Sequence, residues 1–193
     1  MLVGEPGVGK SLFVSRISNL DGVGRETLPK TLAPTWQRAD IPLVPNGQVT
    51  FQLLDMPGSL PELSIPFYAH AHAVVLMFDV GSASSFARMK MLWHTSLKQH
   101  RDLVPGARYA PGSTVVLAHI IDERRERQVT RREASAWCAS AGVGLPYFET
   151  HPLETSPKVL AHLAAAVVLR AAEDEHEAPR PSDAVGPGAA SRK

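Results

Sequence analysis

A segment near the start of the chain, GEPGVGKS at residues 4–11, fits the phosphate-binding loop pattern G-x-x-x-x-G-K-[ST] at every fixed position. Glycines in such a loop let successive backbone N–H groups turn inward around phosphate oxygens. Lys10 can reach the oxygens of the β- and γ-phosphates, and Ser11 can offer its hydroxyl to Mg²⁺. The helix expected after the loop adds the partial positive charge of its N-terminus. The pattern predicts nucleotide binding, against the alternative of a glycine-rich turn between a strand and a helix.

A second motif, DMPG at residues 55–58, stands at the end of an expected strand. The Asp55 carboxylate at that strand end can hold Mg²⁺, usually through water, across from Ser11. The Gly58 N–H can meet a γ-phosphate because no side chain blocks the approach. The alternative is an ordinary strand-to-loop turn. Because a phosphate loop lies upstream, the pattern favours a nucleotide site.

The elements that must position these residues alternate between strands and helices. Strands are expected at 1–3, 73–80, 114–118 and 146–150, and helices at 11–20, 86–99, 131–141 and 157–172. An Asn-Gly pair at residues 46–47 between two alternating apolar runs predicts a hairpin. This order predicts an α/β sheet with helices on both faces. The first strand is short, so either about six residues are missing before it or it is clipped.

Length and composition indicate one globular domain at residues 1–172 and a disordered tail at 173–193, where Glu, Pro, Ser, Gly and Ala prevail. The net charge of +1 gives no argument for a nucleic-acid partner or for electrostatic attachment to a membrane. Cys138 is the only cysteine, which excludes an intrachain disulfide and favours a reducing compartment. No apolar run approaches the roughly 18 residues that span a bilayer. We therefore expect a cytoplasmic protein without signal peptide or direct lipid anchor, which meets membranes only through partners.

Taken together, the phosphate loop, the hairpin, DMPG, FDVGSASSF at residues 78–86 and YFET at 147–150 resemble the small GTPases of the Ras superfamily. Trp93, seven residues after FDVGSASSF, and the run RQVTRREASAWCASAGVGLPYFET at 127–150 are similar to the Rab branch. Within it, the nearest likeness is the Rab-like GTPase family whose animal members carry a fused J-domain. The resemblance spans about residues 1–169. It implies a three-layer P-loop NTPase fold with a mostly parallel six-stranded sheet and one antiparallel hairpin strand.

The resemblance implies GTP or GDP together with Mg²⁺ as cofactors. The residues expected around the phosphates are Gly4, Gly7, Val8, Gly9, Lys10, Ser11 and Leu12. Ser11, Thr35 and Asp55 are the expected Mg²⁺ ligands, with Thr31 as the rival of Thr35 because loop lengths differ from the family on both sides. Thr35 and Gly58 would contact the γ-phosphate. Lys10, Gly58 and Ser59 would make up the catalytic part.

The water-positioning side chain departs from the family. Ser59 follows the glycine of DMPG where the family has a glutamine. A serine is too short to orient the attacking water in the same way, so the hydrolysis of GTP should be slow. Glu5 and Pro6 occupy the tip of the phosphate loop, where Pro6 can crowd an arginine finger supplied by a partner.

The base-reading residues depart further. The family pattern Asn-Lys-x-Asp aligns with residues 119–122, HIID, in which Asp122 can still accept from guanine N1–H and N2–H₂. The resemblance also assigns base contacts to His119, Ile120, Thr150, His151 and Pro152, with Ile120 stacking on the base. Proline at 152 removes an N–H that the family offers to guanine. Each lost hydrogen bond costs roughly 0.5–1.5 kcal/mol, which predicts roughly micromolar affinity.

Three functions follow as hypotheses. The first is a monomeric Rab-like switch in intracellular, vesicle or ciliary trafficking or in signalling, whose effector or regulatory proteins read residues 31–36 and 59–67. The second is a catalytically inactive pseudo-GTPase scaffold that binds partners without hydrolysis. The third, a P-loop kinase or adenine NTPase, is disfavoured by the Rab-like order of motifs.

Overall fold

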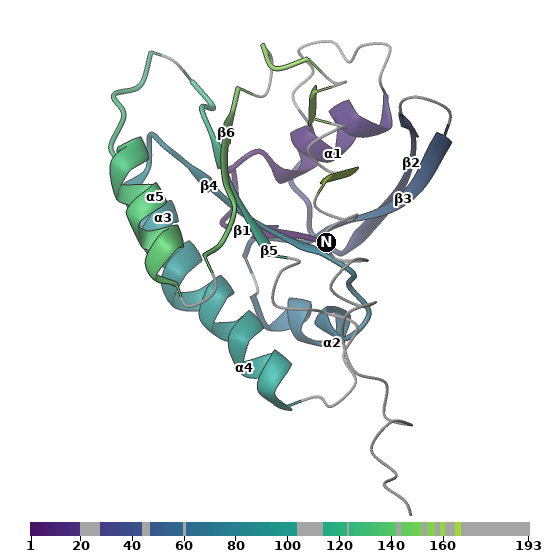
Figure 1. Ribbon diagram of the computed structural model, residues 1–193, viewed down its shortest axis with the longest axis horizontal. Coiled ribbons are helices and arrows are strands. Elements are labelled where there is room, and N and C mark those ends of the chain that lie inside the picture. Colours follow the sequence, from purple (N-terminus) through teal and green to yellow (C-terminus); the bar gives the residue numbers. More distant parts are fainter. Residues whose placement is uncertain are drawn as a thin grey trace, which may run out of the picture.

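Six strands form one sheet in the order β2-β3-β1-β4-β5-β6. Their bounds are Leu2–Gly4 (β1), Thr35–Leu43 (β2), Gly47–Asp55 (β3), Val74–Asp79 (β4), Thr114–His119 (β5) and Tyr147–Thr150 (β6). The computed structural model describes residues 1–19, 28–43, 47–59, 61–103, 114–122, 124–141, 144–151, 154–156, 159–160 and 165–166. Helices cover both faces of the sheet (Figure 1).

The predicted fold class is confirmed. β2 and β3 pair antiparallel over their whole length, from Thr35 opposite Asp55 to Leu43 opposite Gly47. The other neighbouring strands pair in parallel. The sheet is therefore mostly parallel with one antiparallel hairpin strand, as the hairpin signal and the buried strands together predicted.

The helices are α1 (Lys10–Ser18), α2 (Ile65–Tyr68), α3 (Ala83–Arg88), α4 (Thr95–Leu103) and α5 (Arg131–Ser140), with a 3-10 turn at Pro61–Ser64 and a π-helix at Met89–His94. Thr130 is the N-cap residue of α5, and its hydroxyl accepts from the backbone N–H of Glu133 at 3.1 Å. A threonine followed three residues later by glutamate is the capping-box arrangement, which explains why the helix starts there.

The core lies on both faces because side chains along a strand alternate between faces. On β4, Val74, Leu76 and Phe78 join the cluster beneath α2 to α5. Val75 and Met77 of the same strand join the cluster beneath α1. Figure 1 shows α1 on one side of the sheet and α3, α4 and α5 on the other. A strand buried on both faces is a continuous apolar run, which is how its sequence predicted it.

Some sequence expectations need adjustment. The helix expected at 86–99 extends from Ala83 to Leu103 and contains the π-helix. Residues 159–160 and 165–166 are helical, in agreement with the expected last helix, whereas residues 167–172 of the domain and the tail at 173–193 lie outside the described residues. No described helix is both long and apolar enough to cross a membrane.

The parallel strands bring the predicted site residues to one edge of the sheet. The phosphate loop follows β1, Asp55 ends β3, His119 ends β5 and Thr150 ends β6. All four positions lie at carboxyl ends of strands that run in the same direction. In open α/β sheets, ligands bind outside this edge.

Candidate functional site

The phosphate loop connects β1 to α1. Gly9 caps α1 with a left-handed conformation (φ 88°), and no side chain caps the first turn of the helix. A Cβ atom at Gly9 would lie 2.4 Å from His119 Nδ1, so only glycine fits there. The uncapped N–H groups of the first turn remain available to an anion, which is the arrangement expected of a phosphate site.

The Lys10 side chain is hydrogen-bonded to the backbone of the phosphate loop. Its Nζ donates to the backbone oxygens of Gly4 and Glu5, both at 2.9 Å. Burial lowers the pKa of Lys10 to about 8, although the negative charges of Asp55 and Glu5 raise it. An ammonium group has three protons, so one remains to donate to a phosphate oxygen.

Three oxygens meet where Mg²⁺ was predicted. The Ser11 hydroxyl donates to Asp55 Oδ2 at 2.5 Å, and the Thr31 hydroxyl lies 3.0 Å from the same oxygen and 2.8 Å from Ser11 Oγ. Asp55 is buried, and its Oδ1 has no hydrogen-bond partner among the described residues. Hydroxyl and carboxylate oxygens are the ligands that Mg²⁺ prefers, and a buried orphaned carboxylate oxygen is the sign of an unmet charge. The residues present therefore fit a Mg²⁺ ion.

The two candidate threonines lie in different places. Thr35 is the first residue of β2, and its hydroxyl donates to the backbone oxygen of Ala33 at 3.2 Å. The structure brings Thr31, and not Thr35, to the Ser11–Asp55 pair. The sequence left both threonines open because the loop before the hairpin differs in length from that of the family.

Gly58 lies directly against the phosphate loop. A Cβ atom at this position would be 2.4 Å from the backbone nitrogen of Pro6 and 2.5 Å from the carbonyl carbon of Glu5. Any side chain would push the two segments apart, so the contact requires glycine. Ser59, the next residue, is exposed.

His119 ties the base-reading strand to the phosphate loop. Its ring is fully buried, and Nδ1 lies 3.0 Å from the backbone oxygen of Val8. Burial lowers the pKa of His119 to about 4, so the ring is neutral at pH 7 and Nδ1 carries the proton that Val8 accepts. His119 Nε2 and the hydroxyl of Thr150, its register partner on β6, are buried without partners among the described residues.

The other residues predicted to contact the base are brought together less closely than the phosphate-binding residues. Ile120 packs against the core cluster on the α3–α5 face. Asp122 is half-buried and pairs with Arg124 Nε at 3.2 Å. The backbone N–H of His151 donates to the Thr155 hydroxyl at 2.9 Å, and Pro152 lies outside the described residues. The phosphate half of the site is therefore assembled more completely than the base half.

Sequence reasoning missed one set of contacts to the phosphate loop. The Glu5 carboxylate accepts from Arg88 Nε at 2.6 Å and from the indole Nε1 of Trp93 at 3.2 Å. Both partners are distant from Glu5 in the sequence: Arg88 is the last residue of α3, and Trp93 lies within the π-helix. An acidic residue inside a phosphate-binding loop was the available signal, because its charge calls for a cation nearby.

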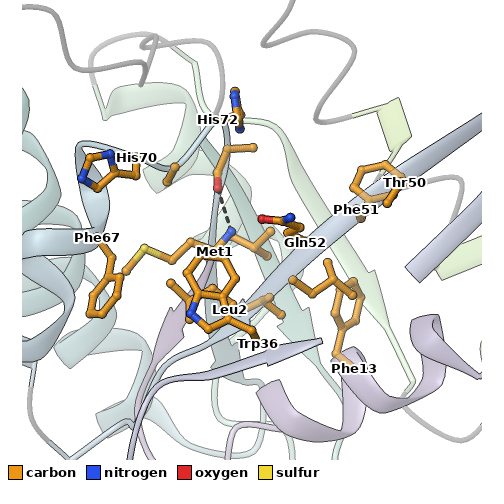
Figure 2. Close-up of a pocket in the computed structure, with 15 residues that line it drawn as sticks. Met1, Leu2, Phe13, Trp36, Thr50, Phe51, Gln52, Phe67, His70 and His72 are labelled. Atoms are coloured by element: carbon orange, nitrogen blue, oxygen red, sulfur yellow. Dashed lines mark hydrogen bonds between the residues drawn. The ribbon is translucent and has the colours of Figure 1, made fainter. Parts of the chain in front are cut away.

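A cavity of about 540 Å³ lies away from the phosphate loop, beside Met1 at the start of β1. Its walls are mostly apolar, and Figure 2 shows Phe67 and Phe13 on opposite sides of Met1 and Leu2. The Met1 ammonium donates to the Ala73 oxygen at 2.9 Å. His70 and His72 line this cavity. It therefore stands at the amino end of the parallel strands, opposite the edge that carries the predicted nucleotide site.

Comparison with known proteins identifies a matching family and several similar proteins. The family model that matches is described as the Ras family and covers residues 1–166. The Ypt/Rab-type GTPase ypt7 of Pyricularia oryzae is 31% identical over 161 residues, which cover 80% of this chain and 73% of that protein. The Ras-related protein Rab-9A of Mus musculus is 30% identical over 186 residues, or 92% of this chain and 85% of that protein. The Ras-related protein Rab-7a of Dictyostelium discoideum is 28% identical over 165 residues, with coverage of 80% and 73%.

Proposed function

The chain belongs to the Ras family of small GTPases, and from this premise we propose that it is a Rab-like GTP/GDP-dependent switch with slow GTP hydrolysis. The observation that supports this most directly is the cluster of Ser11, Thr31 and Asp55 oxygens beside the buried Lys10. A lysine and an oxygen cage for Mg²⁺ at the start of an uncapped helix together suit a nucleoside phosphate.

The residues take distinct roles in binding. Lys10 donates to the β- and γ-phosphate oxygens, and the backbone N–H groups of Gly7, Val8, Gly9 and Leu12 surround the phosphates. Ser11 and Thr31 would offer hydroxyls to Mg²⁺, and the Asp55 carboxylate would help to hold it. When bound, Mg²⁺ neutralises charge on the phosphates. Thr31 and Gly58 lie in two separate loops, and both would contact the γ-phosphate. Because only GTP has this phosphate, the two loops would take different positions in the GTP-bound and the GDP-bound states.

Guanine recognition would fall to Asp122. In the free protein this carboxylate pairs with Arg124, whose side chain is almost fully exposed. An exposed ion pair contributes little free energy, so the carboxylate can exchange it for guanine N1–H and N2–H₂. Ile120, Thr150, His151 and Pro152 remain proposed base contacts.

Slow hydrolysis follows from Ser59. Phosphoryl transfer depends on positioning and on electrostatic stabilisation, and the residue after Gly58 is the one that would orient water. The exposed side chain of Ser59 is too short to orient the attacking water. We propose that Lys10 and Gly58 stabilise the transferred phosphoryl group while water is left poorly oriented.

Partners would read the two segments 31–36 and 59–67. Leu32 is 77% exposed and Trp36 is 56% exposed in the first segment, and Leu63 and Ile65 are exposed in the second. Exposed apolar side chains next to a phosphate sensor suit effector or regulatory proteins that bind one nucleotide state. A role in intracellular trafficking is proposed from the Rab-type relatives.

A pseudo-GTPase scaffold is the second candidate. It is favoured by the fully buried His119 and by the loose assembly of the base-reading residues. A Lys10→Ala variant separates the two functions, because a switch needs the phosphate and a scaffold does not. Unchanged binding of partner proteins by Lys10→Ala would favour the scaffold.

The test of nucleotide binding is an equilibrium titration of the purified protein with GDP, GTP and ATP in Mg²⁺. We expect GDP and GTP to bind with roughly micromolar dissociation constants, ATP to bind more weakly, and Lys10→Ala to lose at least about tenfold in affinity for both guanine nucleotides. Equal displacement by ATP would argue for an adenine NTPase. No binding at about 0.5 mM guanine nucleotide would rule out the switch.

A further inference from the structure

Glu5 is held from several sides. Its backbone oxygen accepts from Lys10 Nζ at 2.9 Å. Its carbonyl carbon lies against Gly58, where a Cβ would come within 2.5 Å. Its carboxylate, only 14% exposed, accepts from Arg88 and Trp93. The residue therefore joins the phosphate loop, the DMPG segment and the helices on the far face of the sheet.

The π-helix explains how two residues reach one carboxylate. Arg88 and Trp93 are five positions apart, which in an α-helix puts side chains about 140° apart around the axis. A π-helix bonds residue i to residue i+5, so such residues lie about one turn apart on the same side. The π-helix at Met89–His94 begins directly after Arg88 and includes Trp93. It is the local geometry that aims both donors at Glu5.

The indole of Trp93 adds a further constraint. Trp93 is fully buried, and Glu5 accepts its N–H. A buried donor without an acceptor is costly, so this contact is favoured whenever the core around Trp93 is formed. Arg88 adds a charge-assisted bond at 2.6 Å, which is stronger than a neutral one. The position of Glu5 thus follows from the packing of the helices.

We propose that Glu5 is a positioning residue for the phosphate loop: the Arg88–Trp93 pair fixes its carboxylate and thereby sets the backbone that Lys10 and Gly58 both contact. This proposal rests on the proposed function, since it names what prepares the same site for phosphate. Gly58 is the proposed contact of the γ-phosphate, so the effect of Glu5 is larger for GTP than for GDP.

The nucleotide affinity of a Glu5→Gln variant separates an effect of position from an effect of charge. A carboxylate near the phosphates repels them, so a Glu5→Gln variant should bind nucleotide more tightly if Glu5 acts only through its charge. If Glu5 acts by position, Glu5→Gln binds more weakly, because the amide keeps the bond from Trp93 but loses the one from Arg88. The sign of the change in affinity therefore separates the two explanations.

The experiment measures the dissociation constants of GDP and GTP for wild type, Glu5→Gln, Glu5→Ala, Arg88→Ala and the double variant Glu5→Gln/Arg88→Ala. We expect GTP affinity to fall about threefold in Glu5→Gln and about tenfold in Glu5→Ala, with smaller losses for GDP. In the double variant, Glu5→Gln should add little to Arg88→Ala, because both remove the same bond.

The control is Arg125→Ala. Arg125 is 54% exposed and pairs with Asp79, which is 10% exposed, whereas Arg88 is 52% exposed and pairs with the 14% exposed Glu5. Replacing either arginine by alanine therefore removes a similar ion pair, but only the Arg88–Glu5 pair involves the phosphate loop. Affinity within about twofold of wild type is expected for Arg125→Ala.

Hydrogen exchange of the phosphate-loop amides in nucleotide-free protein supplies a second readout. Faster exchange at residues 7–10 in Arg88→Ala than in Arg125→Ala is expected. If wild type binds no guanine nucleotide, the proposed function fails, and this exchange difference alone decides the positioning role. Tighter binding by Glu5→Gln, or equal exchange in the two arginine variants, would overturn the inference.

Discussion

At the scale of single residues, the buried lysine links nucleotide binding to pH. Burial lowers the pKa of Lys10 to about 8 in the free protein, from its usual value of 10.5. A phosphate needs the charged form, so the affinity for GDP should fall as pH rises above 8, by up to about tenfold per pH unit. A titration of GDP at pH 7, 8 and 9 measures this. An affinity that stays level over that range would contradict the lowered pKa.

The same residue affects folding with the opposite sign. The unfolded chain binds the Lys10 proton more tightly than the folded chain, since the folded pKa is the lower one. The unfavourable free energy of the buried charge is therefore fully present below pH 8 and is relieved as pH rises towards 10.5. Lys10 thus destabilises the nucleotide-free protein least in the pH range where Lys10 binds phosphate less well.

The two threonines give a matched pair of variants. Thr31→Ala removes a hydroxyl that lies 3.0 Å from Asp55, whereas Thr35→Ala removes one that bonds only locally to Ala33. We expect Thr31→Ala to lower GTP affinity in Mg²⁺ by roughly threefold to tenfold and Thr35→Ala to leave it near wild type. Titrations with and without Mg²⁺ measure the difference. The reverse order would favour Thr35 over Thr31 as the metal ligand.

These residues also show how far a sequence predicts a site. Lys10, Ser11 and Asp55 could be predicted because a fixed spacing after a strand, and a strand end, determine where their side chains go. The choice between Thr31 and Thr35 could not, since the path of a loop of unusual length depends on contacts made in three dimensions. The partners of Glu5 lie more than 80 residues away, and no local pattern pairs them with it.

At the scale of elements, His119 fastens β5 to the phosphate loop. Its Nδ1–H donates to Val8 in a fully buried setting. His119→Ala would leave the Val8 oxygen without this donor and open a cavity, so it should lower the free energy of unfolding by about 1–3 kcal/mol. His119→Asn keeps a donor and should lose less. Denaturant unfolding of both variants measures this, and equal losses would show that the hydrogen bond contributes nothing.

The elements themselves were largely predictable. Apolar runs and alternation predicted β3, β4, β5 and the hairpin, because burial on one or both faces leaves that pattern in the sequence. The π-helix between α3 and α4 was not predictable. Its i to i+5 bonding occurs together with the contacts of Arg88 and Trp93 to Glu5, a residue distant in the sequence, so no local composition specifies it.

At the scale of the whole molecule, the rate of GTP hydrolysis depends on water as much as on phosphate. We expect single-turnover hydrolysis by the wild type to be slow, and Ser59→Gln to accelerate it several-fold, because glutamine is long enough to orient water. Ser59→Ala is the control and should match wild type. Slower hydrolysis by Ser59→Ala than by wild type would show that the serine hydroxyl itself takes part in the reaction.

The chain gathers its phosphate loop, Ser11, Thr31 and Asp55 at one place, which we propose holds a guanine nucleotide through Mg²⁺. The most direct test is the release rate of preloaded fluorescent GDP before and after Mg²⁺ is chelated. We predict that chelation speeds release at least about tenfold in wild type and much less in Thr31→Ala. Release that is the same with and without Mg²⁺, or a protein that retains no GDP at all, would contradict Mg²⁺-dependent nucleotide binding at this site.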